Sequence, residues 1–265
     1  MQSQTASLDD LFQSAVSQGS ISPATLQSLN IQDVGQMIQG CLGIAVDAVT
    51  ASKVFLVSLL VDDSSSIRFA GNTQAMRDGV NSVLDALNAV KNKDGILVSC
   101  RYLNGTVLYP FVPLDQAIRL TSSNYDPYGG TPLYDQTAVL AGSVIAKAQE
   151  FMLNGVPVTS SSLVVTDGHD EGSVNFRRPE AVEPVIRDLL VQEKHIFAAM
   201  GIDDGGTTNF ADIFRRMGFR DEWVMTPSKS GQEIRRCFNM FSQSTASASQ
   251  NATSFSQTAQ AGLNP

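Results

Sequence analysis

Asp and Ser side chains directly after an apolar run form the pattern with the clearest chemical meaning in this chain. Residues 54–61 are apolar except for Ser58, and Asp62, Ser64 and Ser66 follow them at D-x-S-x-S spacing. If the run is a strand, three oxygen-bearing side chains leave its carboxyl end toward one point. Oxygen ligands suit a hard divalent cation such as Mg²⁺, which keeps several waters when the protein supplies few carboxylates. The same spacing also suits an ordinary turn, because Asp and Ser form local hydrogen bonds.

Two later segments supply residues of the same chemistry. Thr131 lies in G-G-T-P-L, and Asp167 ends the run L-V-V-T-D before Gly168. Thr followed by Pro also begins a helix well, with Thr as the N-cap, and the roles of cap and ligand are compatible. Asp-Gly is a common turn, yet open α/β sheets place their ligands at the carboxyl ends of strands. Together the three segments predict a metal site formed by Asp62, Ser64, Ser66, Thr131 and Asp167.

The order of these segments, over about residues 53–242, resembles the von Willebrand factor A domain and its metal-ion-dependent adhesion site. The resemblance implies that the first and the late Asp reach the metal largely through water, while the two Ser and the Thr bind it directly. It also implies one open coordination position for an acidic side chain of a partner protein. Ser65 stands where the family commonly has Gly, and Asp63 adds a carboxylate, which leaves Mg²⁺, Mn²⁺ and Ca²⁺ open as the ion.

Strand-like runs alternate with amphipathic helical segments after residue 53, which predicts an α/β fold with a doubly wound, mostly parallel sheet and helices on both faces. Asn104-Gly105 between two apolar runs predicts an antiparallel hairpin with a type I′ turn, which needs positive φ at both residues. The resemblance implies the same Rossmann-like sheet with one antiparallel edge hairpin.

The chain divides into three parts by composition. Residues 1–50 read as short helices, which must pack on the main domain or on a partner because such helices are unstable alone. Residues 53–242 form the predicted main domain. Residues 243–265 carry no charge and are rich in Ser, Gln and Ala, so we expect a mobile tail.

Charge and terminal composition exclude several classes of function. A net charge of −8 with only 18 Lys and Arg argues against nucleic-acid binding. The amino terminus lacks a basic segment before an apolar core, and no apolar run approaches membrane-spanning length, so we expect a cytoplasmic protein that does not bind membranes. The three cysteines are far apart and indicate neither a zinc site nor a disulfide framework.

Four residues near the predicted ligands are candidates for a rim that contacts the partner: Asp63, Tyr128, His169 and Asp170. Each also has a simpler interpretation. The loop that contains Tyr128 can be read as a Gly/Pro turn, and His169 is more simply a solvated loop histidine.

These observations favour a non-catalytic, metal-dependent protein–protein interaction module whose partner presents Asp or Glu. The resemblance suggests an AAA+ ATPase or another assembly component as that partner. One alternative is a structural subunit of a bacterial assembly that forms homo-oligomers through its terminal arms. A lesser alternative is a metal-dependent hydrolase or phosphatase, although the chain lacks a P-loop and has Ser64 where an aspartyl-phosphate enzyme needs the second Asp of D-x-D.

Overall fold

The structure, a computed structural model, describes residues 6–203 and 205–250 of the chain. Within these ranges the strands form one sheet in the order β3-β2-β1-β4-β5-β6, and all neighbours are parallel except β2 and β3. The predicted doubly wound sheet with one antiparallel edge hairpin is therefore confirmed. The strands are β1 (Val54–Val61), β2 (Ile96–Tyr102), β3 (Val107–Pro113), β4 (Val158–Thr166), β5 (His195–Gly201) and β6 (Val224–Met225).

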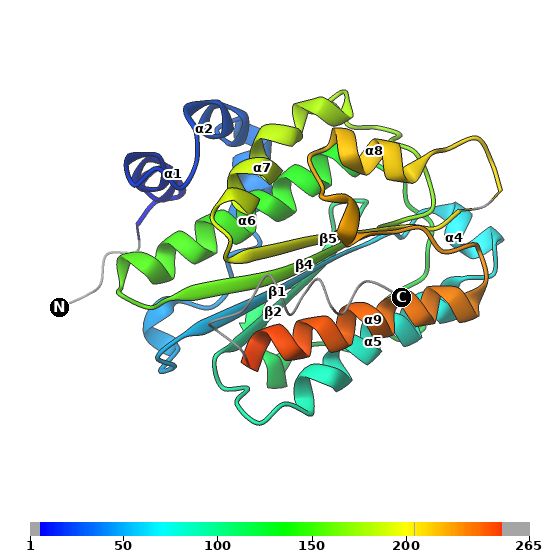
Figure 1. The fold of residues 1–265 in the computed structure, drawn as a ribbon, viewed down its shortest axis with the longest axis horizontal. Helices are drawn as coiled ribbons and strands as arrows, with labels where there is room; N and C mark the ends of the chain where they lie inside the picture. Colours follow the sequence, from blue (N-terminus) through cyan, green and yellow to red (C-terminus); the bar gives the residue numbers. More distant parts are fainter. Residues whose placement is uncertain (1–5, 204, 251–265) are drawn as a thin grey trace.

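Helices cover both faces of the sheet (Figure 1). One face carries α6, α7 and α8, and the other carries α5 and α9. None of the helices in the described ranges combines the length and apolar character needed to cross a bilayer. The helices are α1 (Leu8–Ser17), α2 (Pro23–Leu29), α3 (Gln32–Gln39), α4 (Ser65–Phe69), α5 (Thr73–Asn88), α6 (Leu133–Leu153), α7 (Glu183–Val191), α8 (Phe210–Arg216) and α9 (Gly231–Gln250), with 3-10 turns at Val46–Ala48, Leu114–Gln116, Pro179–Ala181 and Asp221–Trp223.

The residues of β1 are nearly all apolar because this strand is central and both of its faces are covered. Every residue of β1 is buried, as expected for a parallel strand between two helical layers. Its neighbours β2 and β4 lie on opposite sides. The chain therefore adds β2 and β3 on one side of β1 and then crosses over to add β4, β5 and β6 on the other. The carboxyl ends of β1 and β4 therefore meet at a topological switch point, where open α/β sheets bind ligands.

The hairpin between β2 and β3 turns differently from the prediction. Of its two central residues only Gly105 has a positive φ, at 93°, so the type I′ turn is wrong. The Asn104 side chain accepts a hydrogen bond from the Thr106 N–H at 2.7 Å. The backbone N–H of Asn104 donates to the Asp63 carboxylate at 3.0 Å. The long-range bond to Asp63 accounts for the wider turn.

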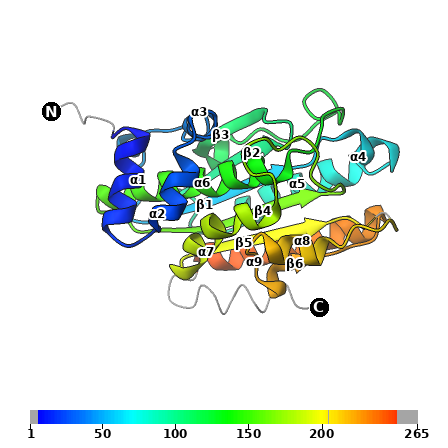
Figure 2. The same ribbon diagram turned by 90° about the horizontal axis from the view of Figure 1, so that it is seen from above.

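The amino-terminal helices pack on the main domain of their own chain. Figure 2 shows α1, α2 and α3 lying against the outer side of α6 and α7. Leu11, Phe12, Leu29, Val34 and Ile38 are buried there. Because α6 has the sheet on one side and these helices on the other, almost all of its residues are buried. The extension thus supplies part of the hydrophobic core.

The end of the extension runs along the outer edge of β3. The Phe111 N–H donates to the Cys41 carbonyl at 3.0 Å, and the Ile44 N–H donates to the Phe111 carbonyl at 2.8 Å. Gly43 adopts φ +64°, and a Cβ there would lie 2.0 Å from the Phe111 carbonyl oxygen. Glycine is required where this segment passes Phe111. The segment covers an edge of the sheet that would otherwise be open to pairing with another strand.

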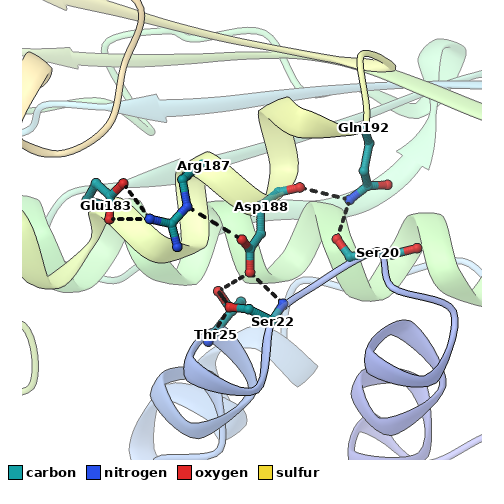
Figure 3. A network of polar contacts seen from close by, with 7 residues as sticks. All are labelled: Ser20, Ser22, Thr25, Glu183, Arg187, Asp188 and Gln192. Carbon is teal, nitrogen blue, oxygen red and sulfur yellow. Dashed lines mark hydrogen bonds and ion pairs between the residues drawn. The ribbon is translucent and has the colours of Figure 1, made fainter.

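Side chains of α7 hold α2 in place (Figure 3). Asp188 accepts hydrogen bonds from the Ser22 N–H and the Thr25 hydroxyl, both at 2.6 Å. Gln192 donates to the Ser20 carbonyl at 3.0 Å. These bonds join segments more than 160 residues apart, so they fix the extension to the domain by tertiary contacts.

Residues 243–250 differ from the prediction of a mobile tail. They form the last two turns of α9, in which Ser244, Thr245 and Ala248 are buried. The Thr245 and Ser161 hydroxyls lie 2.9 Å apart, which ties the helix to β4. Small side chains let α9 lie close to the sheet, so a segment without large apolar residues is still ordered. Residues 251–265 lie outside the described residues.

Candidate metal site

Asp62 is the first residue after β1, and its carboxylate is fully buried. Its Oδ1 accepts the Ser64 N–H at 2.7 Å. Its Oδ2 accepts the Thr166 hydroxyl at 2.8 Å and the Asp167 N–H at 3.1 Å. The parallel pairing of β1 with β4 brings these groups together, because Val61 lies beside Val165. Asp62 therefore joins the ends of both strands.

Ser64, Ser66 and Asp167 form a compact cluster of oxygens in front of Asp62. The Ser64 and Ser66 hydroxyls lie 2.8 Å apart, and both contact Asp167 Oδ1, Ser66 at 2.5 Å and Ser64 at 3.4 Å. Ser64 precedes the first turn of α4, and Ser66 lies within it, so the helix turns both hydroxyls toward β4. The D-x-S-x-S segment and Asp167 meet as predicted.

The loop before α6 brings Thr131 to the same place. Gly129 pairs with Ser64, and its N–H donates to the Asp63 carbonyl at 2.7 Å. On its other side Thr131 pairs with Glu171, whose N–H donates to the Thr131 carbonyl at 2.7 Å. A Cβ on Gly168 would lie 3.6 Å from Thr131 Oγ1, so the Thr131 side chain faces the turn after Asp167.

These segments enclose a hollow of about 320 Å³ at the carboxyl edge of the sheet. Its lining includes four of the five predicted ligands, while Asp62 lies behind them as a fully buried support. The exposed side chains at its mouth are Ser66, His169 and Glu171, and Thr208 closes one side. The hollow is large enough for an ion and several waters.

The donors of this site fit a hard cation. Burial raises the pKa of Asp62, and hydrogen bonds from Ser64, Thr166 and Asp167 to its carboxylate oppose the shift. Within the described ranges no three or more His, Cys, Asp or Glu side chains gather in a metal-binding cluster. The available donors are hydroxyl and carboxylate oxygens, the ligands of Mg²⁺, Mn²⁺ and Ca²⁺ rather than of a thiolate or imidazole site.

The four predicted rim residues have different environments. Tyr128 is 76% exposed, and the side chain of His169 is 65% exposed and lies 3.2 Å from Glu171. Asp170 is half-buried and accepts hydrogen bonds from the Tyr134 N–H at 2.9 Å and the Ser173 hydroxyl at 2.5 Å. Burial raises the pKa of Asp170, and its hydrogen bonds oppose the shift. Tyr128 and His169 therefore face solvent, whereas Asp170 binds the start of α6.

Asp63 lies away from the mouth of the hollow and is only 5% exposed. It accepts the Asn104 N–H, and a Cβ on Gly129 would lie 3.0 Å from its Oδ2. Burial raises the pKa of Asp63 to about 6, against the hydrogen bond from Asn104. The buried carboxylate links two loops and offers no surface to a partner, so its place in the predicted rim is corrected.

Three residues with a part in this site were not predicted from the sequence. Thr166 donates to Asp62, and Glu171 lines the hollow. Asp135, at the start of α6, accepts the N–H groups of Val174, Asn175 and Phe176 at 2.9, 3.2 and 2.7 Å. Asp135 thereby fixes the loop that follows Asp167. The sequence offered one signal for Asp135, which is its place in the first turn of a helix that begins after Thr-Pro.

No protein-family model matches the sequence, and no curated protein sequence matches it. Similar solved structures exist. Proximal thread matrix protein 1 from the mussel byssus is 16% identical with a TM-score of 0.51, and the match covers 73% of this chain and 48% of that one. The pilus adhesin SpaC from Lactobacillus rhamnosus GG is 13% identical with a TM-score of 0.51, over 73% and 31% of the two chains.

The chain spans about half of the length of the first of these two structures and less than a third of the length of the second. Another structure of the thread matrix protein is described as having zinc in its metal-ion-dependent adhesion site (MIDAS). It is 17% identical with a TM-score of 0.45, and the match covers 73% of this chain and 46% of that one. The shared fold is that of the von Willebrand factor A domain, as the resemblance of the sequence implied.

Proposed function

We propose that this protein is a non-catalytic, metal-dependent protein-binding module. Asp62, Ser64, Ser66, Thr131 and Asp167 would hold one divalent cation at the carboxyl edge of the sheet. The observation that carries the proposal is the approach of both Ser hydroxyls to Asp167 Oδ1, at 2.5 and 3.4 Å, inside a hollow open to solvent. When bound, the cation supplies a coordination position for an Asp or Glu carboxylate of the partner.

The protein's own residues have distinct tasks in this proposal. Asp62 aligns the ends of β1 and β4 and provides negative charge behind the ligands. Ser64 and Ser66 can donate to Asp167 and still offer lone pairs to a cation, because a hydroxyl has two acceptor lone pairs besides its O–H. Thr131 closes the opposite side. The partner's carboxylate would enter through the mouth between His169 and Ser66.

The chemistry of the hollow favours binding over hydrolysis. A catalytic site needs a nucleophile activated by an oriented base. The one histidine that lines the hollow, His169, has an exposed side chain that contacts Glu171 rather than a hydroxyl of the site. We therefore assign no reaction to this protein. Release of phosphate from an aryl phosphate, dependent on Mg²⁺ and lost in Asp62→Ala, would contradict this assignment.

Affinity capture with the full chain tests the proposal. The bait is incubated with lysate in Mg²⁺, in Mn²⁺, in Ca²⁺ or in EDTA, and partners are identified by mass spectrometry. We expect partners that are retained with a cation, lost in EDTA and lost with the Ser66→Ala bait. Asp94→Asn is the matched control, because this exposed carboxylate lies at the opposite edge of the sheet, before β2. Equal recovery in EDTA and in Mg²⁺ would contradict the metal bridge.

A further inference from the structure

Exposed apolar side chains gather around the candidate metal site. Within the described residues, three of the six large apolar side chains with high exposure lie one to three positions along the chain from residues that line the hollow: Phe69 at 85%, Tyr128 at 76% and Val174 at 64%. Single exposed apolar residues are common on protein surfaces, but several around one concave site indicate an interaction surface. We call Phe69, Tyr128 and Val174 the apolar rim.

Arg68 links the segments that carry Phe69 and Tyr128. Phe69 ends α4, the short helix that carries Ser66, and Tyr128 directly precedes the Gly129–Thr131 segment that lines the hollow. The Arg68 guanidinium lies 5.2 Å from the centre of the Tyr128 ring and forms an ion pair with Asp126 at 3.4 Å. These contacts link the two loops that bear the aromatic side chains.

Val174 lies three residues after Glu171, which lines the hollow. Its N–H donates to Asp135 Oδ2 at 2.9 Å, and the two following N–H groups also bind Asp135. The backbone under this exposed side chain is thus fixed before any partner binds. A pre-organised apolar surface favours association, because little conformational entropy is lost on binding.

The charged residues beside the hollow are already paired with each other. Arg68 lies next to Asp126, and His169 lies next to Glu171. Among the described residues that line the hollow there is no Lys or Arg, and Asp126 and Glu171 would repel a run of acidic residues. A single carboxylate that reaches the cation, with apolar neighbours on either side, matches this arrangement of charge and apolar surface.

We propose that the partner is a protein segment with one Asp or Glu flanked by apolar side chains, which bind Phe69, Tyr128 and Val174 while the carboxylate reaches the metal site. This inference rests on the proposed function and specifies the chemistry of its partner. Truncating an aromatic residue that anchors an interface can weaken binding about tenfold or more. We expect this effect at Phe69 and Tyr128.

Three synthetic peptides serve as probes of this surface: acetyl-Leu-Phe-Glu-Leu-amide, acetyl-Ser-Gly-Glu-Ser-amide and acetyl-Glu-Glu-Glu-Glu-amide. Binding to the full chain in saturating Mg²⁺ and in EDTA is followed by NMR titration. We expect the apolar-flanked peptide to bind at least about tenfold more tightly than the Ser/Gly-flanked one, in Mg²⁺ only. Phe69→Ser and Tyr128→Ser should remove this advantage without changing the affinity of the Ser/Gly-flanked peptide.

Val191→Ser is the matched control, because Val191 is 70% exposed at the end of α7, before β5 and away from the hollow. Equal affinity of the first two peptides, both sensitive to EDTA, overturns the apolar rim and leaves the proposed function standing. Tightest binding of the tetraglutamate overturns the preference for a single acid. If no peptide binds while calorimetry shows a bound cation, the proposed function fails and this inference fails with it.

Discussion

The Ser66 hydroxyl lies 2.5 Å from Asp167 Oδ1, although 101 residues separate them in the chain. The contact exists because β1 and β4 are adjacent parallel strands that end at the same edge of the sheet. Each strand alone would present an ordinary Asp- or Ser-containing turn. Their pairing converts two turns into one cluster of oxygens, and the predictions about metal binding depend on it.

Asp167→Ala should abolish metal binding and leave the fold nearly intact. Asp167 is 8% exposed at the end of a strand, so its truncation opens no cavity in the core. We expect affinity for Mg²⁺ to fall by about 100-fold or more, at the upper end of the losses caused by groups that act on a metal through an intervening ligand. In EDTA the free energy of unfolding should change by no more than about 1 kcal/mol. Calorimetry and urea unfolding measure the two effects, and intact metal binding would contradict the assignment.

Asp62→Ala should destabilise the protein even without metal. The substitution leaves the Ser64 N–H, the Thr166 hydroxyl and the Asp167 N–H without their acceptor in a buried site. We expect a loss of about 3 kcal/mol in EDTA, because unsatisfied buried donors are costly. Urea unfolding of both variants distinguishes a carboxylate that stabilises the fold, Asp62, from one that mainly serves metal binding, Asp167. Equal free energies of unfolding for the two variants would show that the hydrogen bonds to Asp62 do not stabilise the fold.

The period of a strand explains which site residues the sequence predicted. Side chains alternate between the faces of an extended segment, so Asp62 and Ser64 share a direction while Asp63 points the other way. This alternation was available and would have removed Asp63 from the rim. The position of Glu171 was not available, because it depends on pairing with Thr131 across 40 residues of chain. Patterns along the chain predict ligands at strand ends, but they do not predict the loops that meet there.

Composition was a poor guide to the end of the chain. Residues 243–250 lack charge and large apolar side chains, which suggested a tail without a stable fold. Their small residues nevertheless recur at helical spacing, with Thr245, Ala248 and Ser249 buried. Close packing of small side chains against the sheet stabilises this segment, and the contact with Ser161 is visible only after the sheet is built. The helical periodicity of α9 was the signal that composition obscured.

Asp188→Ala should loosen the amino-terminal helices. The carboxylate accepts two short hydrogen bonds from Ser22 and Thr25, and Thr25 is fully buried. We expect a loss of about 2 kcal/mol, together with faster amide hydrogen exchange in α2. The control is Glu183→Ala on the same helix. Glu183 forms a surface ion pair with Arg187, so its loss should cost less than about 1 kcal/mol. Unchanged exchange in α2 of Asp188→Ala would mean that apolar packing alone holds the extension.

His195 should make the protein less stable as the pH falls. The ring is buried at the start of β5, its Nδ1 lies 2.8 Å from the Ser160 hydroxyl, and burial lowers its pKa from 6.5 to about 3. Below pH 6.5 the unfolded chain binds a proton at this residue and the folded chain does not. The stabilising contribution of neutral His195 is therefore present above pH 6.5 and is lost as the pH falls toward 3.

The loss between pH 6.5 and pH 5 should be about 1.5 kcal/mol. His195→Asn replaces the ring with an amide that can still bond to Ser160 and does not titrate. The variant should be less stable than the wild type at pH 7, because the truncated ring leaves a gap, but this deficit should shrink at pH 5. Urea unfolding at both pH values, in EDTA, measures the difference, and the exposed His169→Asn serves as the control. A deficit that is the same at both pH values would show that His195 is not the group that titrates on unfolding.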